Sequence, residues 1–291
     1  MNAKELYQRL DKDFDLAHCR DDWSSMDFNE YISDNFKQRY MGLVLDNSGK
    51  IERVYTAVFP SDKVINEILD SGEKDVLLFT HHPRVWDINR AAGTFKDIGK
   101  DLLARMKDNR ISLYSLHTPL DRVGEYATNV SFGRALGIKR EKDFDSYYGF
   151  PAGIIGRTET STVDELARKV EKAVGHKIKI WNYGDEAIKD HYVAIVTGGG
   201  NDLEALEELY GLGVNTFITG VTRPSKDFPP ALKSHEYAKE KGINIIGATH
   251  YSTEKFACIA MVDYFKKLGL PAEFIPDKPD LNDMDYEMGV K

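Results

Sequence analysis

Histidine and carboxylate side chains follow three short apolar runs of the chain. His81 and His82 follow the first run, His117 and Asp121 follow the second, and His250 follows the third. Imidazole nitrogens and carboxylate oxygens are ligands that zinc, manganese, iron, cobalt and nickel accept in proteins. Neither cysteine of the chain lies in these clusters, which argues against a closed structural zinc site. The clusters therefore predict a site for divalent metal ions.

Glu254 adds a second carboxylate, four residues after His250 at the start of a predicted helix. Residues four apart face the same way on a helix, and a helix N-terminus favours an anionic side chain. A carboxylate such as Asp121 or Glu254 can bridge two cations. Two metal ions roughly 3.5–4 Å apart can activate a water molecule and neutralise charge on a leaving oxygen. We therefore predict a two-metal site with the ligands His81, His82, Asp121, His250 and Glu254.

His117 and Glu254 are the candidate catalytic residues. Histidine titrates near neutral pH, so His117 could orient a ligand or relay a proton. Pro119 lies between His117 and Asp121, so we expect a loop there rather than a helix. Each residue alone has a structural explanation, because a histidine at a strand end is usually a satisfied polar group and Glu254 complements a helix dipole. The coincidence of histidines and carboxylates at three strand ends favours the metal site.

The elements that position these side chains are short strands that alternate with amphipathic helices. This alternation indicates an α/β fold. The predicted strands cover 41–45, 53–58, 76–79, 111–116, 154–157, 177–181, 193–197, 216–219 and 243–248. The predicted helices cover 63–71, 163–174 (with Thr162 as N-cap) and 253–268. Ligands of open α/β sheets bind beyond the carboxyl ends of the strands. The three clusters meet in one crevice if the strands 76–79, 111–116 and 243–248 are parallel neighbours.

The segment 141–153 is polar, then aromatic, then turn-like, and suggests a division of the chain near residue 145. This predicts an N-terminal α/β lobe, 1–145, with the motifs of His81/His82 and His117/Asp121. A C-terminal lobe, 146–291, would carry the motif of His250 and Glu254. The tail 276–291 contains proline and acidic residues, and we expect it to be partly disordered or to wrap a neighbour.

The bulk composition excludes several classes of protein. The 291 residues carry a formal net charge of -8, which argues against non-specific binding to nucleic acid. No apolar run approaches the roughly 18 residues that cross a membrane, and the charged N-terminus lacks the apolar stretch of a signal peptide. Cys19 and Cys258 fit no disulfide framework. We expect a cytoplasmic protein without a membrane partner.

Three motifs, in order, resemble the signatures of a known family. They are Thr-His-His-Pro at 80–83, His-Thr-Pro-Leu-Asp at 117–121 and His-Tyr-Ser-Thr-Glu at 250–254. They are similar to those of the Nif-three-like family, also called DUF34 or GTP cyclohydrolase I type 2-like proteins. Further similar stretches, spread over nearly the whole chain, are 42–44, Asn129 with 136–137, 197–200 and 219–220.

This resemblance implies two similar α/β lobes with a di-metal site in the cleft between them. It implies metal ligands at His81, His82, Asp121, His250 and Glu254, with His117 in or next to the coordination sphere. It also implies a ring-like homo-oligomer, commonly a hexamer built from dimers. Members of the family are described as metal-dependent hydrolases or GTP cyclohydrolase homologues.

The chain departs from the family pattern in the segments that would line the cleft. Trp23 lies well upstream of Gly42, and Thr249 stands where a glycine commonly precedes the last histidine. An extra segment, 223–232, follows 219–220, and His235 would replace a histidine that the family often places there. These departures leave the predicted ligands in place and affect the substrate.

Two functions from different classes follow. The first is a metal-dependent hydrolase with two divalent ions per chain (zinc, iron, manganese, cobalt or nickel) that acts on a small anionic substrate, a nucleotide or phosphoester. The second is a non-catalytic metal-binding or regulatory scaffold protein. The turn 198–202 before a predicted helix could hold a phosphate, and a plain strand-to-helix turn explains it equally well. Thr222, Arg223 and Lys226 could contact an anionic substrate, although solvated loop residues explain them better.

Overall fold

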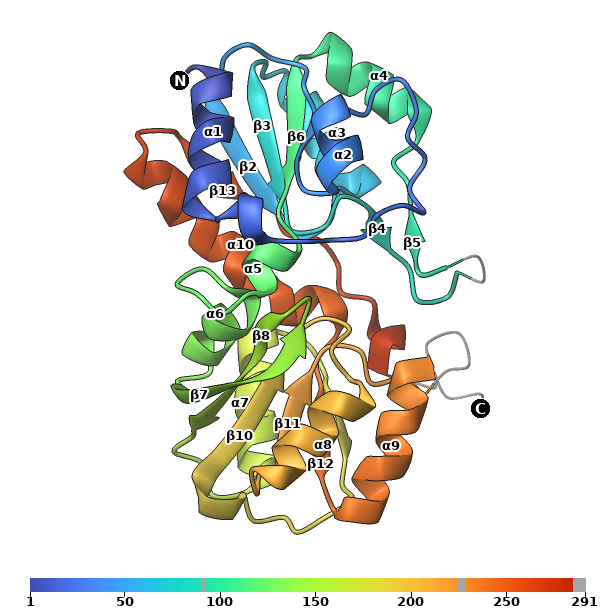
Figure 1. Ribbon diagram of the computed structural model, residues 1–291, viewed down its shortest axis with the longest axis vertical. Coiled ribbons are helices and arrows are strands. Elements are labelled where there is room, and N and C mark those ends of the chain that lie inside the picture. Colours follow the sequence, from blue (N-terminus) through green and yellow to red (C-terminus); the bar gives the residue numbers. More distant parts are fainter. Residues whose placement is uncertain (91–92, 225–228, 285–291) are drawn as a thin grey trace. The chain divides into compact units, whose positions relative to one another are not determined.

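The chain is a mixed α/β protein whose computed structural model describes residues 1–90, 93–224 and 229–284 (Figure 1). It forms two compact units. The first unit contains residues 1–87, 94–120 and 258–277, and the second contains the described residues of 88–93, 121–257 and 278–291. Residue 145, where the sequence suggested a division, lies within a strand of the second unit.

A five-stranded sheet forms the centre of the first unit. Its strands, in spatial order, are β1 (Gly42–Leu45), β6 (Ile111–Ser115), β3 (Val76–Thr80), β2 (Arg53–Ala57) and β13 (Ala272–Phe274). Strand β1 is antiparallel to β6, and the other neighbours are parallel. Every residue of β3 and of β6 is buried, as expected for central strands covered on both faces.

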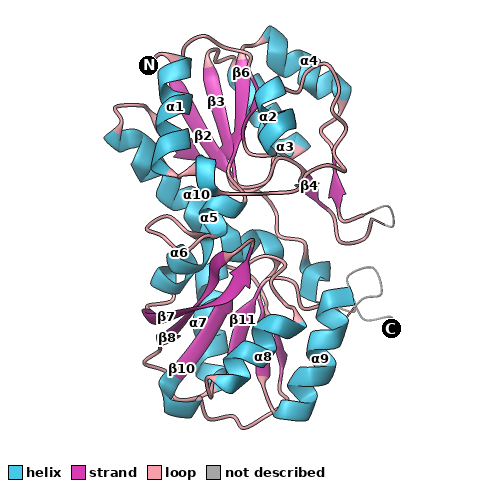
Figure 2. Cartoon of the chain, in the orientation of Figure 1, coloured by secondary structure: helices cyan, strands magenta, loops and turns pink. Residues whose placement is uncertain are grey.

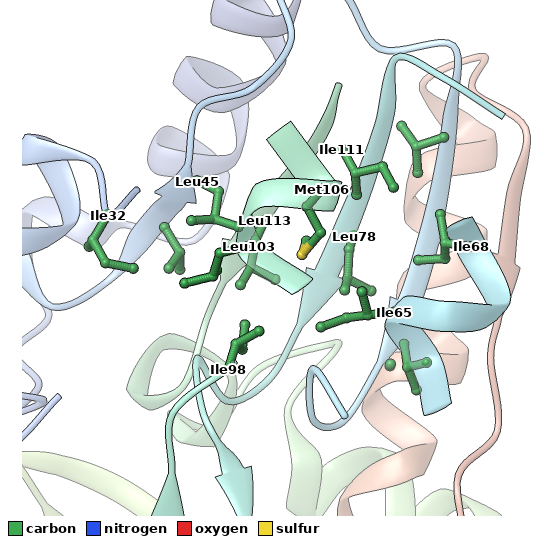
Figure 3. Close-up of a cluster of buried hydrophobic side chains, with 14 of the residues drawn as sticks. Ile32, Leu45, Ile65, Ile68, Leu78, Ile98, Leu103, Met106, Ile111 and Leu113 are labelled. Atoms are coloured by element: carbon green, nitrogen blue, oxygen red, sulfur yellow. The ribbon is translucent and has the colours of Figure 1, made fainter. Parts of the chain in front are cut away.

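Helices cover both faces of this sheet. The helices of the unit are α1 (Ala3–Asp13), the 3₁₀ turn η1 (Leu16–His18), α2 (Asp34–Arg39), α3 (Asp62–Ser71), α4 (Lys100–Asp108) and the end of α10 (His250–Lys267). Apolar residues of α3 and α4, such as Ile65 and Leu103, pack on Leu78 and Leu113 in one core (Figure 3). On the other face Phe79 contacts Phe265 of α10, with ring centroids 5.4 Å apart. A short ribbon, β4 (Val85–Trp86) with β5 (Phe95–Lys96), completes the unit.

A six-stranded sheet forms the centre of the second unit. Its strands, in spatial order, are β7 (Lys139–Tyr147), β8 (Phe150–Arg157), β10 (Tyr192–Val196), β11 (Thr216–Thr219), β12 (Asn244–Gly247) and β9 (Lys179–Trp181). Strands β10, β11 and β12 are parallel, whereas the outer pairs are antiparallel. Three strands therefore end at one edge of this sheet.

Helices also cover both faces of the second sheet (Figure 2). The helices of this unit are α6 (Thr128–Ala135), α7 (Val163–Val174), α8 (Leu203–Gly211), α9 (Pro229–Lys241) and the start of α10, with the turns η2 (Lys189–His191) and η3 (Leu281–Met284). Helices α6 and α7 pack on one face, where Phe132 and Leu166 meet Ile195. Helices α8 and α9 pack on the other, where Leu206 meets Phe217.

The sequence predicted nine strands, and all nine are present with bounds shifted by a few residues at most. The helix 163–174 is confirmed with its N-cap, since the Thr162 hydroxyl accepts a hydrogen bond from the Glu165 amide. Strands β4, β5, β7 and β13 were not predicted. Strand β7 is mostly charged and exposed, so it lacks the apolar alternation on which the prediction relied.

The strand 243–248 is β12 of the second sheet, so it is no neighbour of β3 or β6, and the condition for one shared sheet edge is not met. One local prediction was wrong. The expected loop after His117 is a short helix, α5 (Thr118–Asp121). Pro119 is tolerated there because the first turn of a helix leaves its N–H groups without intrahelical partners.

Of the helices in the described ranges, none combines the length and the apolar character needed to cross a bilayer.

Candidate metal centre

Three histidine side chains meet at the carboxyl edge of the first sheet. His81 follows β3 and His117 follows β6, and these strands are parallel neighbours with Thr80 opposite Ser115. The side chains of His81, His82 and His117 each offer a nitrogen, and these ligand atoms lie within 4.8 Å of one another. The clusters after β3 and β6 therefore follow the rule that ligands gather beyond the carboxyl ends of parallel strands.

Hydrogen bonds fix the orientation of two of these rings. The His81 Nδ1 lies 2.8 Å from the Leu116 carbonyl oxygen, to which it donates. The His117 Nδ1 lies 3.0 Å from Oδ2 and 3.2 Å from Oδ1 of Asp21, and the Thr118 amide donates to the same carboxylate. Both rings thus use Nδ1 for a protein contact, which makes Nε2 the atom that can coordinate a metal.

Aromatic rings surround the histidines. Trp23 meets His117 and His82 edge-on, with centroids 5.2 and 6.0 Å apart. Phe59 stacks on His82 at 4.8 Å, and Phe95 lies 5.3 Å from the same ring. These contacts exclude water and hold the rings in place.

Sequence reasoning missed Asp21 and the packing role of Trp23. Both lie in an irregular segment between η1 and α2, where no hydrophobic period marks a position as buried. The usable signal was an acidic pair followed by tryptophan, at 21–23, ahead of the first strand.

In the second unit, His250 and Glu254 form a buried pair near the start of α10, where Glu254 lies one helical turn after His250. Their Nε2 and Oε1 atoms are 3.1 Å apart, and each side chain is 4% exposed. The predicted i, i+4 placement on one helix face is therefore confirmed for this pair.

The start of α10 is held from two directions. The His250 amide donates to the Asp283 carboxylate at 2.8 Å, and the Ser252 amide donates to the Thr249 hydroxyl at 3.2 Å. Thr249 has a φ of 65°, in the left-handed region that favours glycine. A glycine would adopt this conformation without strain, whereas the side chain of Thr249 makes it unfavourable.

Gly198 makes room for the pair. It follows β10 with a φ of +64°, and a Cβ added there would overlap the Glu254 carboxylate and lie 3.1 Å from the His250 Nε2. Its amide donates to the Thr253 hydroxyl at 2.9 Å. The preceding Thr197 amide donates to the Asn129 side chain of α6 at 2.7 Å, which anchors this strand end.

Asp121 is the last residue of α5 and is partly buried in the second unit. Its carboxylate accepts a hydrogen bond from the Thr128 hydroxyl at 3.1 Å. One oxygen is thus engaged by α6, and a carboxylate has lone pairs left for a second contact.

These donor sets suit a transition metal. Three imidazoles in the first unit, with an imidazole and two carboxylates in the second, provide the nitrogen and oxygen ligands of zinc or iron sites. The clustering of buried histidine rings also suits a cation. It brings several nitrogen lone pairs together away from water, where a proton or a metal ion can satisfy them.

The turn 198–202 offers little to a phosphate. The Asp202 carboxylate caps α8 by accepting from the Ala205 amide at 2.9 Å. Burial raises the pKa of Asp202. Burial, and then the charges of Asp202, Glu208, Glu204 and Asp121, raise the pKa of Asp145 to about 7. This acidic surrounding opposes an anion at the turn.

Among the described residues, His235 and the proposed substrate contacts Thr222 and Arg223 each make structural contacts. The His235 ring contacts the Tyr183 hydroxyl at 3.0 Å and the Thr222 carbonyl at 2.6 Å. Thr222 is fully buried, and Arg223 donates to the Asn89 side chain at 2.9 Å. Lys226 lies outside the described residues.

The described part of the C-terminal tail, up to Met284, packs against the protein. Asp283 and Met284 are fully buried, and the Asp283 carbonyl accepts from the Thr222 and Arg223 amides at 2.8 Å each. The segment from Lys278 to Met284 is therefore part of the second unit.

The fold and these side chains define an α/β protein of two units with candidate metal-binding groups. The sequence profile of the DUF34/NIF3 (NGG1p interacting factor 3) family matches residues 32–280. The chain belongs to this family, as its motifs indicated.

Curated relatives and a solved structure support the assignment. A GTP cyclohydrolase 1 type 2 homolog from Archaeoglobus fulgidus is 28% identical over 269 residues, which cover 90% of this chain and 96% of the relative. A protein of the same name from Borreliella burgdorferi is 29% identical over 267 residues, covering 91% and 94%. The solved structure of protein ybgI, described as of unknown function, superposes with a TM-score of 0.75 at 23% identity, covering 96% of this chain and all of that one. This last likeness concerns the fold alone.

Proposed function

We propose that this protein is a metal-dependent hydrolase that binds two divalent ions per chain. The observation that carries the proposal is the group of His81, His82 and His117 after β3 and β6, in which His81 and His82 are buried and the ligand atoms lie within 4.8 Å of one another. The proposed ligands are His81, His82, Asp121, His250 and Glu254, with His117 as a further ligand or proton carrier.

Bound divalent ions supply Lewis acidity and lower the pKa of a coordinated water molecule. The side chains of the protein would then orient the reactants. The Glu254 carboxylate, 3.1 Å from the His250 Nε2, can hold a proton at Oε1 or neutralise positive charge beside that ring. The His117 Nδ1–H is directed to Asp21, so a proton or a metal would exchange at Nε2.

The substrate we propose is a small anion, a nucleotide or another phosphoester. The names of the curated relatives, homologues of a GTP cyclohydrolase, support this class. A pair of cations also attracts and orients an anionic group. The acidic surrounding of the turn 198–202 disfavours a second phosphate contact there, so the metal ions themselves would bind the anion.

Metal analysis tests the proposal. Protein purified without chelators or a histidine tag would be analysed by plasma mass spectrometry, beside Asp121→Ala, Glu254→Ala and the control Asp263→Ala. Asp263 is an exposed carboxylate on the same helix as Glu254. We expect about two metal ions per chain in the wild type and the control, and fewer in both ligand variants. A wild type that neither contains nor takes up metal would refute the proposal.

The burial of the candidate ligands supports a second function, a non-catalytic metal-binding or regulatory scaffold. His81 is 0% and His82 1% exposed, which suits ions that stabilise the fold. A screen of nucleotides and phosphoesters with metal-loaded protein separates the two functions. Turnover that disappears in Glu254→Gln supports the hydrolase, and metal-dependent stability without turnover supports the scaffold.

We also propose a reducing cytoplasm and a ring-like homo-oligomer. Cys19 and Cys258 both lie among the described residues, are buried, and take part in no disulfide, which supports a reducing compartment. The hexamer follows only from the family resemblance, and the native mass in solution tests it.

A further inference from the structure

We infer that Asp21 is a positioning residue for His117, which it holds in the tautomer that presents Nε2 to a metal. The metal-binding role of His117 rests on the proposed function, whereas its tautomer can be tested in metal-free protein. Asp21 lies 96 residues before His117 in the chain, in the irregular segment ahead of α2.

The contact geometry determines which ring nitrogen carries the proton. The Asp21 carboxylate approaches the His117 Nδ1 with both oxygens, at 3.0 and 3.2 Å. An ionised carboxylate can only accept hydrogen bonds, so the hydrogen must be on Nδ1. In the neutral ring Nε2 then keeps its lone pair. The Asp21 side chain is 2% and the His117 side chain 16% exposed, so little water competes for this bond.

His81 shows the same arrangement with a different acceptor. Its Nδ1 donates to the Leu116 carbonyl at 2.8 Å. Both rings therefore present Nε2 within the group whose ligand atoms lie within 4.8 Å of one another. A carboxylate behind a histidine also raises the basicity of the ring more than a carbonyl does, which strengthens metal binding.

The segment that follows Asp21 directly is anchored by packing and by a hydrogen bond. Trp23 is 5% exposed and packs against the His117 ring, while Met26 is buried in the core of the first unit. Arg84 donates from Nη1 to the Ser25 hydroxyl at 3.0 Å. Because the backbone directly after Asp21 is fixed by these contacts, the Asp21 carboxylate can fix the ring.

The first experiment measures the tautomer in metal-free protein. Long-range ¹H–¹⁵N spectra of ¹⁵N-labelled protein would be recorded at about pH 8.5, where an ordinary imidazole is neutral. The variant His117→Gln assigns the His117 signals. We expect the Nδ1–H form in the wild type and a shift towards the Nε2–H form, which an unconstrained imidazole favours, in Asp21→Ala. Asp22→Asn is the matched control, since Asp22 is an exposed neighbouring carboxylate.

The second experiment measures Zn²⁺ affinity by competition with a chromophoric chelator. We expect Asp21→Ala to weaken binding about 10- to 100-fold, and Asp21→Asn to weaken it less because the amide oxygen can still accept from Nδ1–H. Asp22→Asn should bind as the wild type does. Thermal unfolding of the metal-free variants shows whether each has kept its fold. If Asp21→Ala has not, the Zn²⁺ affinity of Asp21→Asn tests the role of the carboxylate, and an affinity equal to that of the wild type overturns it.

The outcomes separate the two proposals. A His117 ring that keeps its tautomer in folded Asp21→Ala, with Zn²⁺ affinity unchanged in Asp21→Ala and Asp21→Asn, overturns the positioning role. A wild type that binds no Zn²⁺ overturns the proposed function, while an Asp21-dependent tautomer would still establish the role of Asp21. An altered tautomer together with weaker Zn²⁺ binding supports both.

Discussion

Replacing Gly198 by alanine adds one carbon atom beside the His250–Glu254 pair. Gly198 has a φ of +64°, and its Cβ would overlap the Glu254 carboxylate and lie 3.1 Å from the His250 Nε2. The Glu254 carboxylate would have to move away, and this displacement would change the geometry of a proposed metal ligand.

The loss of folding stability in Gly198→Ala has two parts, and the structure offers a control that separates them. The left-handed backbone costs a non-glycine residue about 1–2 kcal/mol. Overpacking in a buried site costs about 1–3 kcal/mol more. Gly175 is the matched control, since it has a φ of +85° and nothing within 4 Å of an added Cβ. The substitution Gly175→Ala should therefore lose only the backbone part, about 1–2 kcal/mol.

Urea unfolding of the two metal-free variants at neutral pH gives the free energies of unfolding. We expect Gly198→Ala to be less stable than Gly175→Ala by about 1–3 kcal/mol. Zn²⁺ affinity, measured by chelator competition, should fall in Gly198→Ala and stay at the wild-type value in Gly175→Ala. Equal stability of the two variants with unchanged Zn²⁺ affinity would show that the added carbon does not disturb Glu254, and the geometry argued above would be wrong.

Three further predictions concern charge and capping. Burial and acidic neighbours raise the pKa of Asp145 to about 7, above the unfolded value of about 3.9, so this carboxyl lowers stability progressively as pH rises from about 4 to 7. Asparagine suits the φ of 59° at this position. Asp145→Asn should therefore raise the free energy of unfolding by about 1–2 kcal/mol at about pH 8, after allowance for the partial exposure of the side chain, and by less at about pH 5. A gain in stability that is independent of pH would contradict this prediction. The Arg110 guanidinium and then the Ser48 hydroxyl hold the pKa of Asp75 below its usual range, so its contribution to stability is present above about pH 4 and is lost as pH falls further. Asp75→Asn should therefore lower the urea midpoint at neutral pH and have less effect at about pH 3, as acid titration of both proteins would show. Asp283→Ala removes the carboxylate that accepts from the His250 amide, and should cost about 1 kcal/mol in urea unfolding and weaken Zn²⁺ binding.

Several parts of the fold could be predicted from local patterns. Strands β3 and β6 are continuous apolar runs, and α7 has both a helical apolar period and a threonine cap. These signals depend on residues close together in the chain, so a single sequence contains them. The same holds for the His250–Glu254 pair, because a spacing of four residues on a helix determines the shared face without any distant contact.

Other parts could not be predicted, because the chain does not encode them locally. Strand β12 looks like any buried parallel strand, and only its hydrogen bonds to β11 and β9 assign it to the second sheet. Strand β7 is charged because it lies at the edge of that sheet, where exposed residues are tolerated. Periodicity describes burial of a face and carries no information about which sheet a strand joins.

For the candidate metal centre, the sequence alone determined the residue types and their placement after strands. Those followed from the chemistry of imidazole and carboxylate ligands and from the tendency of parallel strands to present ligands at their carboxyl ends. Only the tertiary structure decided which partners orient them. Asp21 meets His117 across 96 residues, and Asp283 meets the His250 amide across 33. Both contacts come from irregular segments whose positions are set by packing against the finished units, and no local pattern reports that packing.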